Sequence, residues 1–287
     1  MRVTEKDLHR LIKNKINKAG LSIEHAEVVA DCLVYADARG YHSHGAMRVE
    51  YYSERIAKGG INANPKFEFK ITGPASGVYE GDNGVGFVVA KNGMEEAIKM
   101  AKKNGVAIIG MKHLSHSGSL GYFVEMAADE DLVAISICQS DPMVVPYGGS
   151  EPYYGTNPIA FAAPTADDRK VIFDMATTVQ AWGKILHERS KGNPIPDTWA
   201  VDEKGRPTTD SMKVNALVPI AGAKGYGLMM MVDILSGVML GVPFGKHVSS
   251  MYEDLTKGRD LGQLHIVIDP ARFFDLDKFK RYMSQTL

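Results

Sequence analysis

Val106-Ala107-Ile108-Ile109-Gly110-Met111 is a short apolar run that lies between two stretches with helical periodicity, residues 87–103 and 120–128. An apolar run of this length between helices is typical of a buried strand. The alternation continues along the chain with apolar runs at 132–138, 159–163, 171–174 and 264–268 and with a helical stretch at 178–189. Short strands that alternate with helices predict an α/β fold.

The chain before this region is predicted to be helical. Thr4 and Asp7 form a capping box ahead of an amphipathic stretch that Gly20 ends. Ser22 caps a second stretch, which ends at Gly40. The sequence therefore predicts a pair of N-terminal helices.

A third helix is expected from about Ala46 to Lys58, which makes residues 1–72 a helical subdomain. Residues 73–270 are expected to form the α/β domain, because the strand signals lie there. Within it, the apolar stretch Tyr226–Leu240 is expected to be a buried helix that is too short to cross a bilayer, which needs about 20 apolar residues. A charged helix is expected at 275–283.

The composition is that of an ordinary globular protein, with 45% hydrophobic and 23% charged residues among 287. Thirty-three Lys and Arg stand against 34 Asp and Glu, so the formal net charge is −1 and bulk charge attracts neither nucleic acid nor an anionic membrane. We therefore expect no nucleic-acid or membrane partner. Only two cysteines, Cys32 and Cys138, and a polar start without a signal peptide predict a reducing compartment, the cytoplasm.

Three chemically useful side chains recur at intervals of four residues: His44, Arg48 and Tyr52. On one helix they would share a single stripe. An arginine can hold a carboxylate through two parallel hydrogen bonds. The spacing therefore predicts a binding site for a small carboxylic acid.

Two plainer interpretations of this segment stay open. Glu50 and Glu54 could balance Arg48 and Arg55 on a solvated helical face. His42-x-His44 could instead be half of a metal site. No carboxylate or third histidine sits nearby, and zinc usually takes three or four ligands, so we expect no metal.

A second candidate is His116, in the polar loop 113–119 between a predicted strand and the helix after it. Loops of this kind line ligand clefts in α/β proteins. A histidine that titrates near neutrality there is a reasonable general acid or base for an alcohol or a carbonyl group. The alternative is a loop histidine that bonds to a local carbonyl group.

No Rossmann fingerprint accompanies the strands. Gly84-x-Gly86 and Gly225-x-Gly227 both lack the third small residue and the ribose-binding acid of that pattern. Lys224 and Gly225 at the start of the apolar helix could still offer an ammonium and backbone amides to a pyrophosphate. The alternative is that the glycines only ease the start of that helix.

The run Ala36-Asp37-Ala38-Arg39-Gly40, followed by His42-Ser43-His44-Gly45 and Arg48, resembles the signature of the malate/L-lactate/L-sulfolactate dehydrogenase family. Further stretches of likeness lie at 140–146, 175–184, 195–202, 224–231 and 248–252. The resemblance implies a nicotinamide enzyme with a mixed-sheet, non-Rossmann α/β domain and an N-terminal helical subdomain. It also implies a site in the cleft between these two parts, and a homodimer.

Within the family, the likeness is greatest to members that oxidise (S)-ureidoglycolate to oxalurate with NAD+, a step of allantoin breakdown. The resemblance thus implies NAD as cofactor and a small 2-hydroxy acid as substrate. One alternative is a dehydrogenase or reductase of another such acid, for example malate, lactate or sulfolactate. A non-catalytic binding relative is the alternative of a different class.

The resemblance also assigns roles to residues. His116 would take the hydroxyl proton, because its flexible loop can meet nicotinamide and substrate together, and His44 is its rival. Arg48 would hold the carboxylate, while Ser43 and Tyr52 complete the substrate pocket. The NAD+ site would be lined by Ser140, Asp174, Met175, Ala176, Lys224 and Gly225.

Members of the family usually continue beyond the position of Leu287, and the part that follows packs on the N-terminal helices. Residues 271–287 are therefore expected to be the start of a C-terminal segment that returns to the helical subdomain and is truncated.

Overall fold

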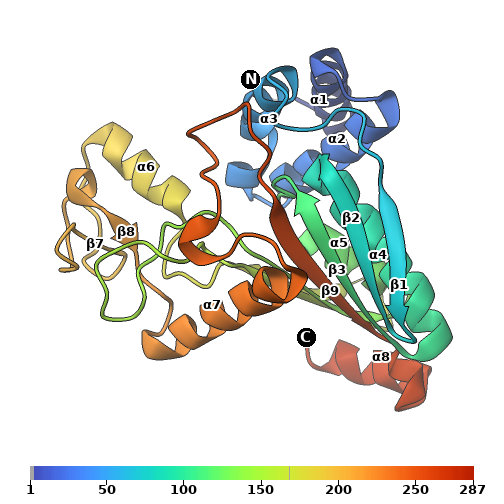
Figure 1. Cartoon of the computed structure of the whole chain (residues 1–287). Coiled ribbons are helices and arrows are strands. Elements are labelled where there is room, and N and C mark those ends of the chain that lie inside the picture. The colour runs from blue at the N-terminus through green and yellow to red at the C-terminus, as the bar shows by residue number, and fades with distance from the viewer. Residues whose placement is uncertain (1–2, 168) are drawn as a thin grey trace.

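The computed structural model describes residues 3–167 and 169–287. At its centre is a seven-stranded mixed sheet with the order β1-β2-β3-β9-β4-β5-β6 (Figure 1). In this sheet β2 and β3 are parallel and the other neighbouring strands are antiparallel. The strands are β1 (Glu68–Gly73), β2 (Ser76–Gly84), β3 (Val106–Leu114), β4 (Val133–Cys138), β5 (Ile159–Pro164), β6 (Lys170–Met175) and β9 (Leu261–Ile268). The predicted mixed-sheet α/β fold is confirmed.

The predicted N-terminal helices are present as α1 (Glu5–Ala19) and α2 (Ile23–Ala38). The Thr4 hydroxyl accepts the N–H of Asp7, and the Ser22 hydroxyl accepts the N–H of His25, so both helices begin at the predicted caps.

Helices cover both faces of the sheet. The first face is covered by α4 (Gly86–Asn104) and α5 (Gly121–Asp129), and α7 (Ala223–Ser236) lies against the other (Figure 1). A single buried cluster joins Leu33 of α2 to Phe87 of α4 and Phe123 of α5. The helical part and the sheet therefore share one core, and a domain boundary at residue 72 stays a prediction.

The third helix begins later than predicted. Two 3-10 turns, His42–His44 and Ala46–Arg48, come before α3 (Val49–Ala57). The Asp37 carboxylate at the end of α2 accepts the N–H of Ala46 at 2.7 Å and holds the His42 ring at 2.8 Å. Because this carboxylate fixes the chain at both turns, a regular helix starts only at Val49.

Helix α6 (Trp182–Lys191) also starts later than the expected residue 178. The Val179 N–H donates to the Val218 carbonyl group at 3.1 Å, which keeps this part of the chain extended. With β7 (Ala200–Val201) and β8 (Ala216–Leu217), α6 forms a small unit that the sequence analysis does not anticipate. It has a separate buried cluster that includes Val144, Tyr154, Ile185 and Leu217.

The apolar helix expected at 226–240 is present as α7, but the expectation that it is buried is wrong. The stretch 223–240 is apolar and long enough to pass for a membrane span, but only a third of it is buried. Its α-helix ends at Ser236 and is followed by a 3-10 turn, Val238–Leu240. At about 1.5 Å per residue, α7 is too short for a hydrocarbon core about 30 Å thick.

The charged terminal helix is α8 (Leu276–Gln285), which the Asp275 carboxylate caps by accepting the N–H of Lys278. The Lys280 ammonium pairs with Asp131 at 2.6 Å, and the Lys280 carbonyl group accepts the Ala166 N–H at 3.1 Å. This helix therefore packs at the end of the sheet away from α1–α3 (Figure 1). A return of the chain to the helical subdomain stays a prediction.

Candidate active site

A cavity of about 270 Å³ lies where the turns after α2, the loop after β3 and the loops after β4 and β6 meet. Segments from the helical part and from the sheet both line it, as expected for a site between them. Eight of the eleven predicted site residues line the cavity: Ser43, His44, Arg48, His116, Ser140, Asp174, Met175 and Ala176. The other three, Tyr52, Lys224 and Gly225, are not among its lining residues.

Two histidines from distant parts of the chain stack in this cavity. The rings of His44 and His116 lie with centroids 5.8 Å apart and planes 28° from parallel. Burial, and next the charge of Arg48, lower the pKa of His44 to about 4. Burial, and next His44 and Arg48, hold the pKa of His116 well below its ordinary value. The expectation that His116 titrates near neutrality is therefore wrong, and both imidazoles are neutral at pH 7.

Tyr52 lies behind His116 rather than in the cavity wall. It is 1% exposed, and its Oη lies 2.6 Å from Nδ1 of His116. The Gly118 N–H points at the same nitrogen at 3.3 Å. The ring is therefore fixed by Tyr52 and Gly118 instead of moving with a flexible loop, and Nε2 is the nitrogen left for a ligand.

Arg48 reaches the cavity from the second 3-10 turn, so His44, Arg48 and Tyr52 do not form a stripe on one helix. Arg48 Nε donates to the Ser43 carbonyl oxygen at 2.8 Å, and Nη1 donates to Tyr252 Oη at 2.9 Å. Within residues 3–167 and 169–287 no carboxylate pairs with Arg48. Its guanidinium is therefore oriented, charged and available to an anion.

The interpretation of this segment as a balanced solvated face is wrong. Glu50 pairs with Lys15 at 3.1 Å and Glu54 pairs with Lys58 at 2.7 Å, so neither carboxylate reaches Arg48. Arg55 is buried, at 1% exposure.

The structure separates the two histidines of His42-x-His44. His42 is exposed and lies 2.8 Å from Asp37, so the expectation that no carboxylate lies near this histidine is wrong. His44 faces the cavity. Among the described residues, the cluster with metal-ligand spacing is His9, Glu27 and Asp31, between α1 and α2.

Asp174 at the end of β6 also lines the cavity and offers an acceptor. Its Oδ2 accepts the Ser119 hydroxyl at 2.7 Å and the Gly121 N–H at 2.8 Å. Burial raises the pKa of this carboxyl, and the hydrogen bond from Ser119 opposes that rise. In the part of the chain that the structure describes, Oδ1 has no partner. An acceptor beside apolar Met175 and Ala176 fits the carboxamide and flat ring of a nicotinamide.

Lys224 and Gly225 lie outside the cavity at the head of α7. Lys224 is exposed. Gly225 is buried, and a Cβ at this position would overlap the Ile220 carbonyl group. This close approach explains Gly225 by packing rather than by an easier helix start, and the binding of a pyrophosphate there stays a prediction.

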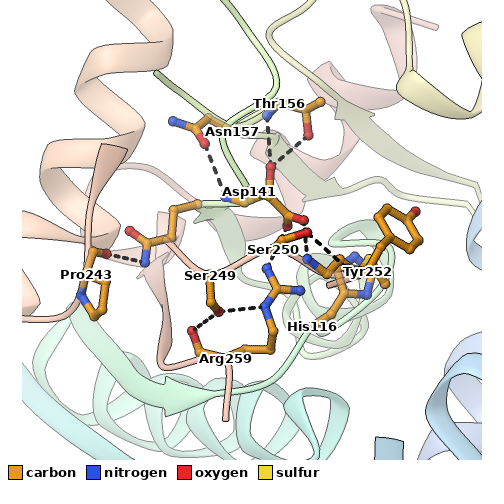
Figure 2. A network of polar contacts seen from close by, with 12 residues as sticks. His116, Asp141, Thr156, Asn157, Pro243, Ser249, Ser250, Tyr252 and Arg259 are labelled. Atoms are coloured by element: carbon orange, nitrogen blue, oxygen red, sulfur yellow. Dashed lines mark hydrogen bonds and ion pairs between the residues drawn. The ribbon is translucent and has the colours of Figure 1, made fainter. Parts of the chain in front are cut away.

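A buried ion pair of Asp141 and Arg259, which no sequence signal indicated, lies beside the cavity residue Tyr252 (Figure 2). Arg259 Nη2 donates to Asp141 Oδ1 at 2.6 Å, and Arg259 Nε donates to Ser249 Oγ at 3.1 Å. The other oxygen of Asp141 accepts the Met251 N–H at 2.5 Å. The partners are 118 residues apart, so no local spacing could reveal them. Tyr252, which lines the cavity, was missed for the same reason.

Comparisons with known proteins match the whole chain. A family model described as malate/L-lactate dehydrogenase matches residues 3–287. The ureidoglycolate dehydrogenase (NAD(+)) of Escherichia coli K12 is 60% identical over 287 residues, which cover 100% of this chain and 82% of that enzyme. The malate dehydrogenase of Pyrococcus horikoshii is 41% identical, over 100% of this chain and 81% of that enzyme.

Solved structures agree with these matches. The sulfolactate dehydrogenase of Methanocaldococcus jannaschii has a TM-score of 0.93 and 36% sequence identity, over 100% of this chain and 83% of that chain. The likeness therefore extends from sequence to fold.

Proposed function

The chain belongs to the malate/L-lactate dehydrogenase family, and we propose that it oxidises (S)-ureidoglycolate to oxalurate with NAD+. The observation that carries this proposal is the meeting of His44, Arg48 and His116 in one cavity. The carboxylate of a 2-hydroxy acid needs a positive donor, and its hydroxyl group needs a proton acceptor. The 60% identity to the Escherichia coli enzyme favours ureidoglycolate over other acids of this class.

Arg48 binds the substrate carboxylate in this proposal. Ser43 and Tyr252 occupy one N–H on each of two guanidinium nitrogens, so three of the five N–H groups stay free for the carboxylate. The substrate hydroxyl group then forms the second contact, with the imidazoles of His44 and His116. Two fixed points orient the C2–H bond, and orientation is the main contribution that a protein makes to hydride transfer.

The hydroxyl proton passes to Nε2 of His116, since Nδ1 is occupied by Tyr52. To accept a proton, the neutral ring must carry its hydrogen on Nδ1 and donate it to Tyr52 Oη. The Gly118 N–H, 3.3 Å from Nδ1, favours the opposite tautomer. His44, stacked on His116, therefore remains the second candidate for the proton acceptor.

NAD+ supplies the hydride acceptor when it is bound. Asp174 would offer an acceptor to its carboxamide, and Ser140, Met175 and Ala176, which line the same cavity, would hold its nicotinamide end. We propose that Lys224, exposed at the head of α7, attracts the phosphates outside the cavity.

The test is formation of NADH by the purified chain with NAD+ and (S)-ureidoglycolate, beside malate, lactate and sulfolactate, and with NADP+ in place of NAD+. We expect a clear preference for ureidoglycolate with NAD+. A preference for another acid keeps the dehydrogenase and rejects the substrate. No turnover with any acid, at a concentration where the folded protein binds NAD+, points to the non-catalytic relative.

A homodimer in the cytoplasm completes the proposal. Met230, Met231, Ile234, Val238 and Met239 form an exposed apolar stripe along α7 and the turn after it. Contiguous apolar surface of this kind marks contacts between chains. Cys32 and Cys138 are both free, as expected in a reducing compartment.

Sedimentation velocity of the wild type and of Ile234→Asp tests the dimer. We expect a dimer that the charge on α7 converts to monomer. A wild type that sediments as a monomer rejects the dimer, and a variant that remains dimeric rejects α7 as its interface.

A further inference from the structure

Residues 249–259, here called the strap, come between α7 and β9 in the chain and contribute Met251 and Tyr252 to the lining of the cavity. The strap contains no helix or strand, yet several buried polar contacts hold it (Figure 2). It carries Tyr252, whose side chain reaches Arg48. Because these contacts fix the strap, they also fix the position of the Tyr252 side chain.

Asp141 anchors both ends of the strap. One carboxylate oxygen accepts Arg259 Nη2 at 2.6 Å, and the other accepts the Met251 N–H at 2.5 Å. Arg259 is 1% exposed and Asp141 is 7% exposed, so little solvent competes for either contact. Because a single carboxylate holds positions 251 and 259, Tyr252 is fixed next to the anchored end.

Arg55 of α3 holds the strap at two carbonyl groups. Its Nη1 donates to the Met251 carbonyl oxygen at 3.4 Å, and its Nη2 donates to the Lys257 carbonyl oxygen. The Leu255 carbonyl group sits so close to Gly60 that a Cβ at residue 60 would overlap it. The strap is thus held by the helical part and by the sheet together, the two sides of the cavity.

Tyr252 itself is half exposed, so its position depends on the strap and not on burial in a core. Its Oη accepts Arg48 Nη1 at 2.9 Å. The hydroxyl proton of Tyr252 has no acceptor among the described residues, and the side chain lines the cavity. This leaves an O–H donor beside the free N–H groups of Arg48.

We propose that Tyr252 is a second carboxylate-binding residue, which orients the Arg48 guanidinium and donates its own O–H to the substrate carboxylate. The Asp141–Arg259 ion pair is a positioning device that keeps Tyr252 there through the strap. This inference rests on one part of the proposed function, namely that the substrate is a 2-hydroxy or 2-oxo acid. Any acid of that class carries the carboxylate that Tyr252 contacts.

Tyr252→Phe removes the hydroxyl group and keeps the ring. We expect KM for the preferred 2-hydroxy acid to rise about tenfold or more, because a hydrogen bond to a charged group is lost. We expect kcat to change less than about threefold and KM for NAD+ to stay the same. Tyr282→Phe, on α8 and far from the cavity, is the matched control with wild-type constants.

A neutral substrate separates carboxylate binding from a general loss of structure. With the primary amide of the same 2-hydroxy acid, Tyr252→Phe should lower kcat/KM much less than it does with the acid. An equal loss on acid and amide, or no loss on the acid, overturns the assignment. Titration calorimetry with oxalurate provides a readout without turnover, and an unchanged Kd in Tyr252→Phe also overturns it.

The role of Asp141 is tested by a double-mutant cycle. Asp141→Asn should raise KM for the acid in the wild-type background and have little further effect in Tyr252→Phe. Additive effects would overturn the link through the strap. Loss of a buried ion pair can unfold a protein. Ser249→Ala therefore serves as the milder second variant, because it removes the two contacts of Ser249 Oγ to Arg259, one from Nε and one to the carbonyl oxygen, and keeps the ion pair.

Discussion

Arg48 and Lys224 are the two cations for which the sequence predicts anion binding, and the structure places them in different surroundings. Arg48 lines the cavity and donates to Ser43 on the preceding turn and to Tyr252, 204 residues further along the chain. Lys224 is exposed at the start of a helix whose Gly225 is explained by packing against the Ile220 carbonyl group. A cation becomes a specific binding group where distant segments orient it, and a helix start alone does not achieve this.

Among variants of the cavity and of the start of α7, the largest change in kcat is expected for His116 in the cavity. His116→Ala should lower kcat about 10²-fold to 10⁴-fold, the usual contribution of a general base. Steady-state kinetics with NAD+ and the preferred acid measure it, with His44→Ala as the comparison. If His44→Ala shows the larger loss of kcat and His116→Ala the smaller, the roles of the two rings are exchanged.

Arg48→Ala comes next. It should raise KM for the acid by about 10-fold to 100-fold, because a hydrogen bond to a charged group contributes roughly 1.5–3 kcal/mol. KM for NAD+ should hardly change. Unaltered KM for the acid would remove Arg48 from the carboxylate site and with it the contrast to Lys224.

Two glycines in α7 test whether packing explains the glycine beside Lys224. Gly225→Ala should lower the free energy of unfolding by about 1–3 kcal/mol, since its Cβ overlaps the Ile220 carbonyl group. Gly227→Ala has open space around its Cβ and should raise the free energy of unfolding by roughly 0.5–1 kcal/mol. Urea denaturation measures both. Equal effects of the two substitutions would contradict the packing explanation.

The pH dependence of kcat/KM links Arg48 to the histidines. A neutral imidazole accepts a proton only above its pKa, and the pKa of His44 is lowered to about 4 by burial and then by Arg48. The acid limb should therefore lie below pH 6.5 and move to higher pH in Arg48→Ala. An acid limb at 6.5 or above in the wild type would show that neither buried ring is the proton acceptor.

The same histidines predict how stability responds to acid. An imidazole whose pKa is lowered in the folded state binds fewer protons there than in the unfolded state. The contribution of these histidines to the free energy of unfolding should therefore be fully present above about pH 6.5, the pKa of histidine in the unfolded state. It should fall as the pH drops toward the pKa of the folded state. Urea midpoints across this range measure it.

The smallest effect is expected at Lys224. Lys224→Ala should raise KM for NAD+ by no more than about fivefold, because an exposed charge contributes roughly 0.2–1 kcal/mol. KM for the acid should stay the same. If KM for NAD+ rises more than tenfold, Lys224 is a specific binding group like Arg48 and the contrast between them is wrong. If KM for NAD+ does not rise, Lys224 lies outside the cofactor site.

Local sequence signals predicted most elements of the fold. The caps at Thr4 and Ser22 and the apolar run 106–111 depend on contacts within a few residues, so they could be read directly. The start of α3 could not, because Asp37 reaches across from α2 to hold Ala46. The exposed face of α7 was missed too, because apolar composition does not say which side of a helix has a neighbour.

The sequence by itself determined the α/β class, the capped N-terminal helices and, through its motifs, the family and the histidines and arginine of the site. Only the tertiary structure decided that Tyr52 lies behind His116, that Arg48 meets Tyr252 and that Asp141 pairs with Arg259. The physical reason is the range of the contacts. Helix caps and strand periodicity arise between near neighbours, whereas the orientation and ionisation of the site depend on groups 64 to 204 residues apart that only the folded chain brings together.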